Sequence, residues 1–472
     1  MSESSNINHR KIIKGVANSW DCPRYTYDLL LSIEKLIYGG DGLARTATGA
    51  DGRSLTVFVP FVLPGERVEA EIRQEKPGFA RGAVTQLVEA SPDRIEARCP
   101  YFRQCGGCHY QHISYGRQLE FKAGILRETL QRIAKIELKS EIRLHPSPSW
   151  NYRNRTRLQV RISPEFALGY FRTSSHEFLP VRECPIISPL LNRVMARLVE
   201  LGGLTCPATV GEIELFADAE DERLLAWAFC GSKPDKRDLL RWAESLQHEF
   251  LEISGVTFFS SRQRSSEQRI EDDDVLTDLK AFAQLGAKSI RYHTKNHKYQ
   301  VSAGAFFQVN RHLIDELVSV VTGNASGDVA LDLYAGVGMF STVLSRSFHH
   351  ILGVEASQTA YADLVQNVPA NVKAVGARTE DFLEGDFPKS RPVRKRPDLV
   401  VLDPPRTGAG KRVIRSLVEL GTPRVRYVSC DPATLARDLA PLLAAGYHIE
   451  EAHLFDLFPE TFHIESVMQL AR

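Results

Sequence analysis

The sequence contains no hydrophobic run long enough to cross a membrane. A transmembrane helix needs roughly 20 consecutive apolar residues, and every apolar stretch of this chain is shorter. The first residues, MSESSNINHRKIIKG, also lack the apolar core of a secretory signal peptide. We therefore expect a soluble cytoplasmic protein without a membrane partner.

The chain has no strong excess of charge of either sign, and no internal repeat or low-complexity segment. Its 59 Lys and Arg residues balance 58 Asp and Glu residues, so the formal net charge is +1. This balance does not exclude RNA as a partner, because a local basic face is enough to bind it. A hydrophobic content of 43% is typical of a globular protein, and 472 residues are enough for two to four domains.

Four regions of the chain differ in their residue pattern. We expect a disordered polar tail over residues 1–25 and a small β-barrel of the OB type over residues 26–90, where short strands alternate with glycine and proline turns. Residues 91–300 mix helix and strand patterns, which predicts an α+β domain. Residues 301–472 alternate apolar strands with helices, which predicts a doubly wound, Rossmann-like α/β domain.

The last two predicted strands, YHIEEAHLFDLF and HIESVMQLA, are joined by a short loop. Such a hairpin requires the final strand to run antiparallel to its neighbour. Ligands of open α/β sheets bind at the carboxyl ends of the parallel strands. An antiparallel final strand begins at that same edge of the sheet, so we expect the residues at its start to lie beside the ligand.

The first strand of the C-terminal region leads into a glycine turn, DLYAGVGMFS, which contains Gly336 and Gly338. Glycine lets the backbone turn tightly and approach a ligand closely. Glu355 ends the next strand, where an acid can hold ribose hydroxyls. Ser341 replaces the third glycine of a dinucleotide-binding turn. The turn therefore favours S-adenosylmethionine, which has no pyrophosphate, over NAD.

A second motif, LDPPRTG, follows the fourth strand and contains Asp403 and Arg406. Adenine N-methyltransferases carry an aromatic residue after the two prolines, and this residue stacks on the base. Arg406 occupies that place here, so we do not expect the target atom to be an exocyclic amine. The alternative is a proline-stiffened turn that binds nothing.

The stretch RYVSCDPATLARDL places Cys430 between the end of a strand and the start of a helix. A thiolate that adds to carbon 6 of uracil makes carbon 5, otherwise a poor nucleophile, able to attack a methyl group. Cys430 would be this thiolate, favoured by the N-terminus of the following helix. Glu465, at the start of the final strand, would remove the proton from carbon 5. His463 competes for the role of base, and an inert buried thiol is the alternative for Cys430.

A second group of cysteines lies in the predicted α+β region. Cys99, Cys105 and Cys108 fall within ten residues, and Cys184 is the best candidate for a fourth ligand. Four thiolates suit zinc or an iron–sulfur cluster, and the uneven spacing favours iron–sulfur. Such a cluster would fold a loop-rich segment and shape an RNA surface. His109 and His112 are alternative ligands, and the scattered cysteines are interpreted as structural: Cys22, Cys206 and Cys230.

The barrel and the stretch NYRNRTR, residues 151–157, are candidate sites for single-stranded RNA, because arginines flank an aromatic residue in that stretch. An ordinary basic strand face explains the same pattern equally well. In either case the target uridine must leave its base stack to reach Cys430.

Five motifs together resemble the RNA 5-methyluridine methyltransferases: SCDPATLARDL, LDPPRTG, FFQVN, DLYAGVG and FPETFHIES. The resemblance implies methylation of a uridine in ribosomal or transfer RNA by S-adenosylmethionine. Met339 and Phe462 depart from the residues that relatives often carry. The roles that the resemblance implies are nucleophile for Cys430, base for Glu465, and cofactor contacts for Gln308, Tyr334, Glu355 and Asp403.

The cysteine pattern resembles the ribosomal RNA branch of this family. That branch carries a [4Fe–4S] cluster at the positions that match Cys99, Cys105, Cys108 and Cys184, and an N-terminal barrel of the TRAM type, which residues 26–90 match. The resemblance therefore implies a methyltransferase of 23S ribosomal RNA, and we expect a monomer without an obligate protein partner. The alternatives are the same chemistry on transfer RNA and a non-catalytic iron–sulfur protein that binds RNA.

Overall fold

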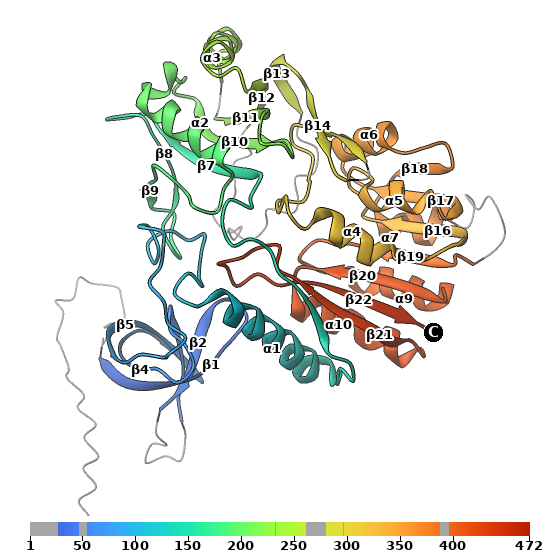
Figure 1. Ribbon diagram of the computed structural model, residues 1–472, viewed down its shortest axis with the longest axis horizontal. Coiled ribbons are helices and arrows are strands. Elements are labelled where there is room, and N and C mark those ends of the chain that lie inside the picture. The colour runs from blue at the N-terminus through green and yellow to red at the C-terminus, as the bar shows by residue number, and fades with distance from the viewer. Residues whose placement is uncertain (1–26, 47–53, 232, 261–279, 296, 388–395) are drawn as a thin grey trace, which may run out of the picture. The chain divides into compact units, whose positions relative to one another are not determined.

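The computed structural model describes residues 27–46, 54–231, 233–260, 280–295, 297–387 and 396–472 (Figure 1). The predicted tail over residues 1–25, with Cys22, lies outside this range. The chain forms two compact units, each described below by itself. Unit 1 comprises residues up to Ile125 together with Glu460–His463, and unit 2 comprises Leu126–Pro459 and Ile464–Arg472.

Unit 1 begins with a closed five-stranded barrel, which confirms the predicted fold of this region. Alternate residues of its strands point inward, so that side chains such as Leu31, Ile33, Val57 and Val59 form a small apolar core. The strand order around the barrel is β1-β2-β3-β5-β4. The strands are β1 (Asp28–Leu36), β2 (Asp41–Arg45), β3 (Thr56–Pro60), β4 (Arg67–Lys76) and β5 (Phe79–Glu89).

A buried ion pair joins the barrel to the segment that follows it. Glu66 is completely buried, and its carboxylate accepts hydrogen bonds from Arg94 Nε (2.5 Å) and Arg94 Nη2 (2.7 Å). The backbone N–H of Leu63 donates to the same carboxylate (2.8 Å). This segment then leads into the first helix, α1 (Tyr115–Ala134).

Unit 2 contains a seven-stranded sheet with the order β13-β12-β11-β10-β7-β8-β9. Its strand β11 reads LLAWAFC and is buried along its whole length, as expected for a central strand covered on both faces. The strands are β7 (Arg155–Arg161), β8 (Ala167–Phe171), β9 (Phe178–Pro180), β10 (Val210–Ala217), β11 (Leu224–Cys230), β12 (Ile253–Ser260) and β13 (Ala281–Gly286). The helices of this region are α2 (Pro189–Glu200), η1 (Gly202–Leu204) and α3 (Lys236–Glu249).

A hairpin and a second, eight-stranded sheet complete unit 2. The sheet order is β18-β17-β16-β19-β20-β22-β21-β6, and the five strands from β18 to β20 are parallel. The hairpin is β14 (Ser289–His293) and β15 (Lys298–Ser302). The sheet strands are β6 (Ile142–His145), β16 (Gly327–Leu333), β17 (Phe348–Glu355), β18 (Val372–Gly376), β19 (Leu399–Leu402), β20 (Arg424–Ser429), β21 (His448–Phe455) and β22 (Glu465–Ala471). The helices are α4 (Ile314–Thr322), α5 (Met339–Leu344), α6 (Gln358–Asn367), α7 (Thr379–Asp381), η2 (Phe382–Asp386), α9 (Gly410–Leu420) and α10 (Pro432–Ala444).

The predicted direction of the final strand is confirmed. Strand β22 pairs antiparallel with β21 and also antiparallel with β20, so it lies between them in the sheet. The strand at the edge, β6, was not predicted as part of this sheet. It pairs in parallel with β21 and comes from residues that precede the seven-stranded sheet in the chain.

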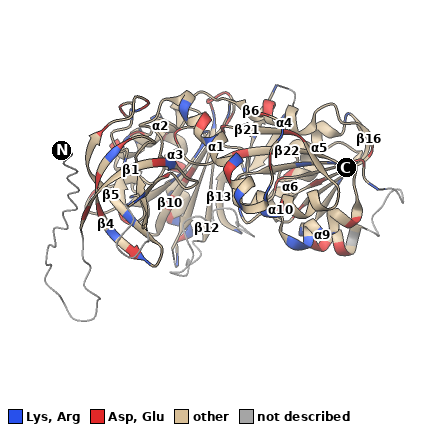
Figure 2. Cartoon of the chain, turned by 90° about the horizontal axis from the view of Figure 1, so that it is seen from below, with Lys and Arg blue, Asp and Glu red and all other residues tan. Residues whose placement is uncertain are grey.

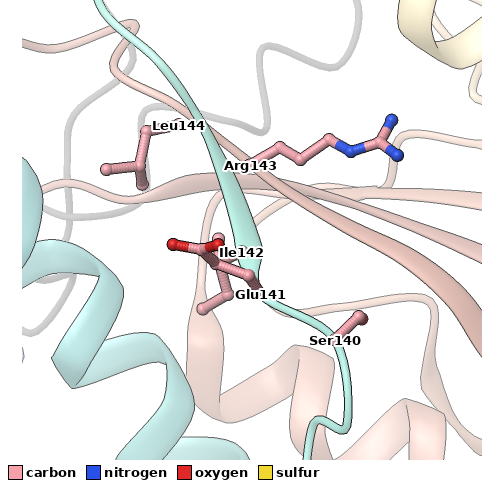
Figure 3. A pocket seen from close by; sticks show the side chains of 5 residues that line it. All are labelled: Ser140, Glu141, Ile142, Arg143 and Leu144. Carbon is pink, nitrogen blue, oxygen red and sulfur yellow. The ribbon is translucent and has the colours of Figure 1, made fainter.

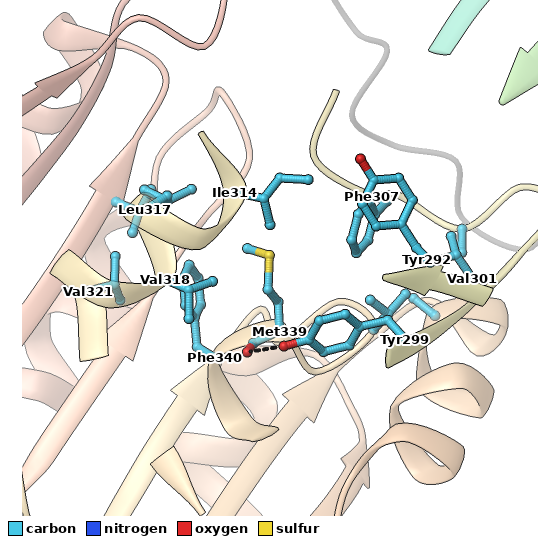
Figure 4. Packing of buried hydrophobic residues seen from close by; sticks show 14 of the residues in the cluster. Tyr292, Tyr299, Val301, Phe307, Ile314, Leu317, Val318, Val321, Met339 and Phe340 are labelled. Carbon is cyan, nitrogen blue, oxygen red and sulfur yellow. Dashed lines mark hydrogen bonds between the residues drawn. The ribbon is translucent and has the colours of Figure 1, made fainter. Parts of the chain in front are cut away.

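The glycine turn and the hairpin β14–β15 share one apolar core. Figure 4 shows the Met339 side chain beside Ile314 and Phe340, with Tyr299 below it. The Tyr299 hydroxyl donates a hydrogen bond to the Met339 carbonyl oxygen (3.2 Å). Met339, one of the two departures from the family pattern, is therefore a core residue. No helix in the described ranges is both long and apolar enough to span a membrane.

Candidate active site

The candidate site lies at the carboxyl ends of the parallel strands in the eight-stranded sheet. Strand β16 ends at Leu333, β17 at Glu355, β19 at Leu402 and β20 at Ser429. Because neighbouring parallel strands end at the same edge, the turns that follow them are brought together. The glycine turn, Glu355, the LDPPRTG motif and Cys430 all lie at or directly after the ends of these strands.

The turn after β16 uses left-handed backbone at three positions: Tyr334 (φ 62°), Gly336 (φ 55°) and Gly338 (φ 91°). A Cβ atom on Gly338 would lie 2.7 Å from Leu364 Cδ1, whereas one on Gly336 would meet no atom within 4 Å. Gly338 is thus favoured first by its left-handed backbone, and a Cβ atom there would also have to displace the end of the Leu364 side chain. Gly336 faces open space, as expected for a turn that leaves room for a ligand.

Glu355 holds the glycine turn to the next strand. Its Oε2 accepts a hydrogen bond from the backbone N–H of Gly336 (2.8 Å), and its Oε1 accepts one from the backbone N–H of Ser357 (2.6 Å). Burial raises the pKa of Glu355, and the backbone N–H donors partly oppose this shift. The backbone N–H of Ala356 also donates to this carboxylate. Of its four lone-pair sites, one remains that can accept a ribose hydroxyl.

A buried aspartate explains the serine at the third glycine position. Asp332 is 1% exposed, and its Oδ2 accepts hydrogen bonds from the Ser341 hydroxyl (2.6 Å) and the Ser341 backbone N–H (2.8 Å). Its Oδ1 has no hydrogen-bond partner among the described residues. Burial raises the pKa of Asp332 to about 7. This pairing was not predicted, although an acid at the end of a strand and a serine in the following turn were both visible in the sequence.

Tyr334 and Gln308 are held in place by their surroundings. Burial raises the pKa of Tyr334, whose hydroxyl hydrogen bonds with Thr379. Gln308 is 7% exposed, and its backbone carbonyl oxygen accepts a hydrogen bond from Asn154 Nδ2 (3.0 Å). Nearby, Phe306 is 57% exposed, which is unusual for a phenylalanine. An exposed ring two residues before Gln308 is a further candidate for contact with an unpaired base, and the sequence reasoning missed it.

Cys430 follows the last residue of β20, and Glu465 is the first residue of the neighbouring strand β22. Ser429 of β20 pairs with Ser466 of β22 in the antiparallel ladder. The next position on each strand toward this edge is Cys430 and Glu465, respectively. Cys430 is half-buried and Glu465 is buried.

The helix after Cys430 begins as predicted. Asp431 caps α10, because its Oδ1 accepts hydrogen bonds from the backbone N–H groups of Ala433 (2.9 Å) and Thr434 (2.8 Å). Pro432 occupies the first helical position, where its missing N–H is harmless. The positive end of the helix therefore lies next to Cys430, which favours a thiolate.

The competing base, His463, belongs to a segment that is packed in unit 1. In that unit the Glu460 carbonyl oxygen accepts hydrogen bonds from the backbone N–H groups of His109 and Tyr110, both at 2.9 Å. The Phe462 ring packs edge-on against Tyr38 and against His109, with centroids 5.6 and 4.6 Å apart. Phe462, the second departure from the family pattern, is therefore a packing residue of unit 1.

The four cysteines expected to bind a cluster are divided between the units. Cys99, Cys105 and Cys108 lie in unit 1 and Cys184 in unit 2, and all four are half-buried. The described residues contain no group of three or more His, Cys, Asp or Glu side chains arranged to hold a metal ion. Cys206 and Cys230 are buried, and burial raises the pKa of Cys206 to about 12 and that of Cys230 to about 11. Both agree with the predicted structural role.

His109 and His112 are packing residues rather than free ligands. His112 is 2% exposed, and its ring lies 5.5 Å from the Phe102 ring. Its Nε2 lies 3.5 Å from the Val62 carbonyl oxygen. Burial lowers the pKa of His112 to about 3.

Two of the three arginines in residues 151–157, Arg155 and Arg157, are engaged by other groups of the protein. Arg155 donates to the Ala305 carbonyl oxygen (2.9 Å) and stacks over Phe216, and Arg157 donates to Glu214 Oε2 (2.9 Å). The structure thus favours the strand-face interpretation of this stretch for both residues. Elsewhere, Figure 2 shows basic and acidic residues close together around α9, and Arg412 of this helix pairs with Glu384 of η2 (2.5 Å).

A hollow of about 410 Å³ lies beside strand β6. Ser140, Glu141, Ile142, Arg143 and Leu144 line it (Figure 3). Arg143 is committed to an ion pair with Glu451 at 3.0 Å. The hollow contains none of the predicted site residues, so it is not the candidate active site.

Known proteins resemble this chain along most of its length. A 23S rRNA (uracil(1939)-C(5))-methyltransferase, RlmD, of Halomonas elongata is 32% identical over 93% of this chain and 89% of its own. An RNA methyltransferase of Halalkalibacterium halodurans, described as uncharacterized, is 31% identical over 93% of this chain and 96% of its own.

A solved structure also matches both units. The tRNA (uracil-54, C5)-methyltransferase of Pyrococcus abyssi, crystallised with S-adenosyl-L-homocysteine, is 25% identical, with a TM-score of 0.68 over 94% of this chain and 100% of its own. Residues 26–85 match the family model of the TRAM domain, and residues 114–472 match the family model described as tRNA (Uracil-5-)-methyltransferase. The chain therefore belongs to the tRNA (uracil-5-)-methyltransferase family, and it is an RNA uracil-5-methyltransferase that carries a TRAM domain.

Proposed function

We propose that this chain methylates carbon 5 of a uridine in 23S ribosomal RNA through a transient covalent bond between Cys430 and carbon 6. The observation that supports the proposal is the β20–β22 register, whose last pair, Ser429 and Ser466, is directly adjacent in sequence to Cys430 and Glu465. A nucleophile and a base on the same edge are what this reaction requires.

In this mechanism, the chain supplies the nucleophile and the base. The Cys430 sulfur forms a bond to carbon 6, and the electron pair displaced from the ring makes carbon 5 nucleophilic. S-adenosylmethionine, when bound, supplies an electrophilic methyl group. Glu465 then accepts the proton of carbon 5, the bond between sulfur and carbon 6 breaks, and Cys430 leaves as a thiolate. The N-terminus of α10 stabilises that thiolate at both ends of the cycle.

The glycine turn and the neighbouring strand ends are the proposed cofactor site. The open space beside Gly336 leaves room for the cofactor, and Glu355 has acceptor capacity left for ribose hydroxyls. Tyr334, Asp403 and Gln308 are the other proposed contacts. Phe306, being exposed, would stack on an unpaired base of the RNA.

Ribosomal RNA is the favoured substrate because of the named relatives. The proteins of Halomonas elongata and of an Enterobacter species, 32% and 31% identical, are both named 23S rRNA methyltransferases. Transfer RNA is the second candidate, since the solved relative is named a tRNA (uracil-54, C5)-methyltransferase. We also propose that the protein is a monomer. The division into domains over residues 26–90, 91–300 and 301–472 is likewise a proposal.

We further propose that Cys99, Cys105, Cys108 and Cys184 bind a [4Fe–4S] cluster. The donor chemistry supports this: the Gly107 backbone N–H donates to Cys105 Sγ (3.4 Å), and the backbone N–H groups of Ile186 and Ile187 hydrogen bond with the Cys184 sulfur. Such N–H donors stabilise thiolate ligands. Iron and sulfide analysis of anaerobically purified protein tests the proposal, and absence of both from folded protein contradicts it.

Nucleoside mass spectrometry tests the function. The protein would be incubated with labelled S-adenosylmethionine and with separate pools of unmodified ribosomal and transfer RNA. We expect labelled 5-methyluridine in ribosomal RNA only. Label in transfer RNA only would overturn the substrate assignment but keep the chemistry. A protein that binds both RNA pools and forms no 5-methyluridine would instead support the non-catalytic alternative.

A further inference from the structure

One buried carboxylate fastens the loop after β19 to the middle of α10. Asp438 is 3% exposed, and its Oδ2 accepts hydrogen bonds from the backbone N–H groups of Ala409 (2.8 Å) and Gly410 (3.3 Å). The Tyr427 hydroxyl of β20 donates to the same oxygen (2.8 Å). Arg437 Nε donates to the other oxygen, Oδ1 (3.2 Å). Three separate segments of the chain therefore meet at this one side chain.

The loop lies directly on the helix at this point. Arg437 Nη2 donates to the Thr407 carbonyl oxygen (2.7 Å). Gly408 has a left-handed backbone (φ 80°), and a Cβ atom on it would lie 2.6 Å from Asp438 Oδ2. Any side chain at Gly408 would push the loop away from α10. The contact thus depends on both the glycine and the carboxylate.

The same helix begins immediately after Cys430. Helix α10 starts at Pro432, and a helix is a rigid element that rises about 1.5 Å per residue. Asp438 lies in its second turn, while its first turn is capped by Asp431. The loop that Asp438 holds begins with Asp403, a proposed cofactor contact. Helix α10 thereby connects the proposed nucleophile to the proposed cofactor site.

We propose that Asp438 is a positioning residue for methyl transfer: it fixes residues 403–410, and with them Asp403, relative to Cys430. This inference rests on the proposed function. Asp438 itself touches no reacting atom in this scheme. Without the Asp438 carboxylate, residues 403–410 would no longer be held against α10, whereas Cys430 would keep its place at the start of that helix.

The competing explanation is that Asp438 only stabilises the fold, and the chain offers a matched control for it. Asp363 of α6 is completely buried and likewise accepts several hydrogen bonds, from the Ser302 backbone N–H (2.7 Å), the Ser302 hydroxyl (2.7 Å) and Gln300 Nε2 (3.0 Å). It fastens α6 to β15, not the loop that carries Asp403. Both carboxylates lie in unit 2, so their replacement by Asn removes a similar number of buried interactions.

The experiment compares Asp438→Asn with Asp363→Asn in the full chain. Thermal unfolding gives the stability of each variant, and calorimetry with S-adenosyl-L-homocysteine gives its cofactor affinity. We expect both variants to unfold at lower temperature. Only Asp438→Asn should bind S-adenosyl-L-homocysteine about tenfold or more weakly, because the hydrogen bonds to the loop lose their charge assistance and an amide NH2 replaces one acceptor oxygen. Asp363→Asn should stay within about twofold of the wild type.

Tyr427→Phe is the milder variant if Asp438→Asn does not fold. It removes the donor to Asp438 Oδ2 and a second acceptor for the Ala409 N–H (3.2 Å), but keeps both backbone bonds to Asp438. It should therefore weaken binding by a smaller factor in the same direction. Equal losses of affinity in the Asp438 and Asp363 variants would overturn the proposal, as would unchanged affinity in Asp438→Asn and Tyr427→Phe. Affinity is measured without RNA. If the wild type forms no 5-methyluridine, the proposed function is wrong. The affinity measurements still decide whether Asp438 positions the loop, because they do not depend on methylation.

Discussion

The Ser466 hydroxyl donates a hydrogen bond to the Ser429 carbonyl oxygen (3.3 Å) across the last rung of the β20–β22 ladder. This rung lies directly beside Cys430 and Glu465. A one-residue slip of β22 would turn every side chain of the strand to the opposite face. The relation between the proposed nucleophile and base is therefore fixed by backbone pairing within the sheet rather than by a flexible loop.

Replacing Cys430 and replacing Glu465 should have opposite effects on the amount of covalent protein–RNA complex. Cys430→Ala should form no covalent complex with RNA, because it lacks the sulfur. Glu465→Gln should accumulate the complex on ordinary uridine RNA, because the proton of carbon 5 is not removed and the elimination cannot follow. Denaturing gel electrophoresis with labelled RNA measures both.

Two matched variants control this assay. Cys206→Ala removes a buried cysteine and Glu450→Gln an exposed carboxylate, and both should turn over RNA as the wild type does. An adduct formed by Cys430→Ala would remove the cysteine from the mechanism. Normal turnover by Glu465→Gln would shift the role of base to His463.

The two glycines of the turn after β16 should respond differently to alanine. Gly338→Ala places a methyl group 2.7 Å from Leu364 Cδ1, so we expect a loss of roughly 2–4 kcal/mol of stability from overpacking and the left-handed backbone. Gly336→Ala has free space and should lose only about 1–2 kcal/mol. Its methyl group would instead enter the proposed cofactor site and weaken S-adenosyl-L-homocysteine binding.

Thermal unfolding and calorimetry on the two variants measure this difference. A Gly336→Ala protein that binds S-adenosyl-L-homocysteine with wild-type affinity would show that the cofactor does not lie against this turn. Unchanged stability in Gly338→Ala would show that the packing around Leu364 can adjust.

Asp332 should make stability fall as the pH rises from about 4 to 7. Burial first, and the nearby charge of Glu355, raise its pKa from the ordinary value of 3.8 to about 7 in the folded protein. The folded state therefore binds more protons than the unfolded state in this window, and its advantage is lost as Asp332 ionises. The slope is at most about 1.4 kcal/mol per pH unit.

Asp332→Asn tests this dependence. The amide keeps an acceptor for Ser341 but cannot ionise. The difference in stability between variant and wild type should grow in favour of the variant as the pH rises, when unfolding is measured at pH 5, 6, 7 and 8. A difference that is constant with pH would show that Asp332 is ionised throughout.

The ion pair between Glu66 and Arg94 should be important for the stability of unit 1. The Glu66 side chain is completely buried and that of Arg94 is 14% exposed. Arg94→Met leaves a buried carboxylate without its partner, which costs about 3–5 kcal/mol. The exposed pair Arg45–Glu34 is the control, and Arg45→Met should cost less than about 1 kcal/mol. Equal losses of stability in Arg94→Met and Arg45→Met, measured by denaturant unfolding, would contradict the importance of the buried pair.

Much of the fold follows from local patterns. Alternating residues and turn residues predicted the barrel, because a strand with one buried face has a period of two. Continuous apolar strands alternating with helices predicted the parallel sheet, and a short connection predicted the antiparallel final strand. Cys430 and Glu465 could be assigned to one edge on that basis alone, before their pairing register was known.

Other relations depend on which distant segments pack together, and a linear pattern contains no such information. Strand β6 joins a sheet whose other strands come much later in the chain, and Glu460–His463 packs in unit 1 although it lies near the C-terminus. Arg155 and Arg157 looked like ligands for RNA until their aromatic and acidic partners were known. Asp438 and Asp332 likewise acquired a role only through their hydrogen-bond partners. Hydrophobic periodicity thus determines the elements, whereas packing and the pairing of buried polar groups determine the site.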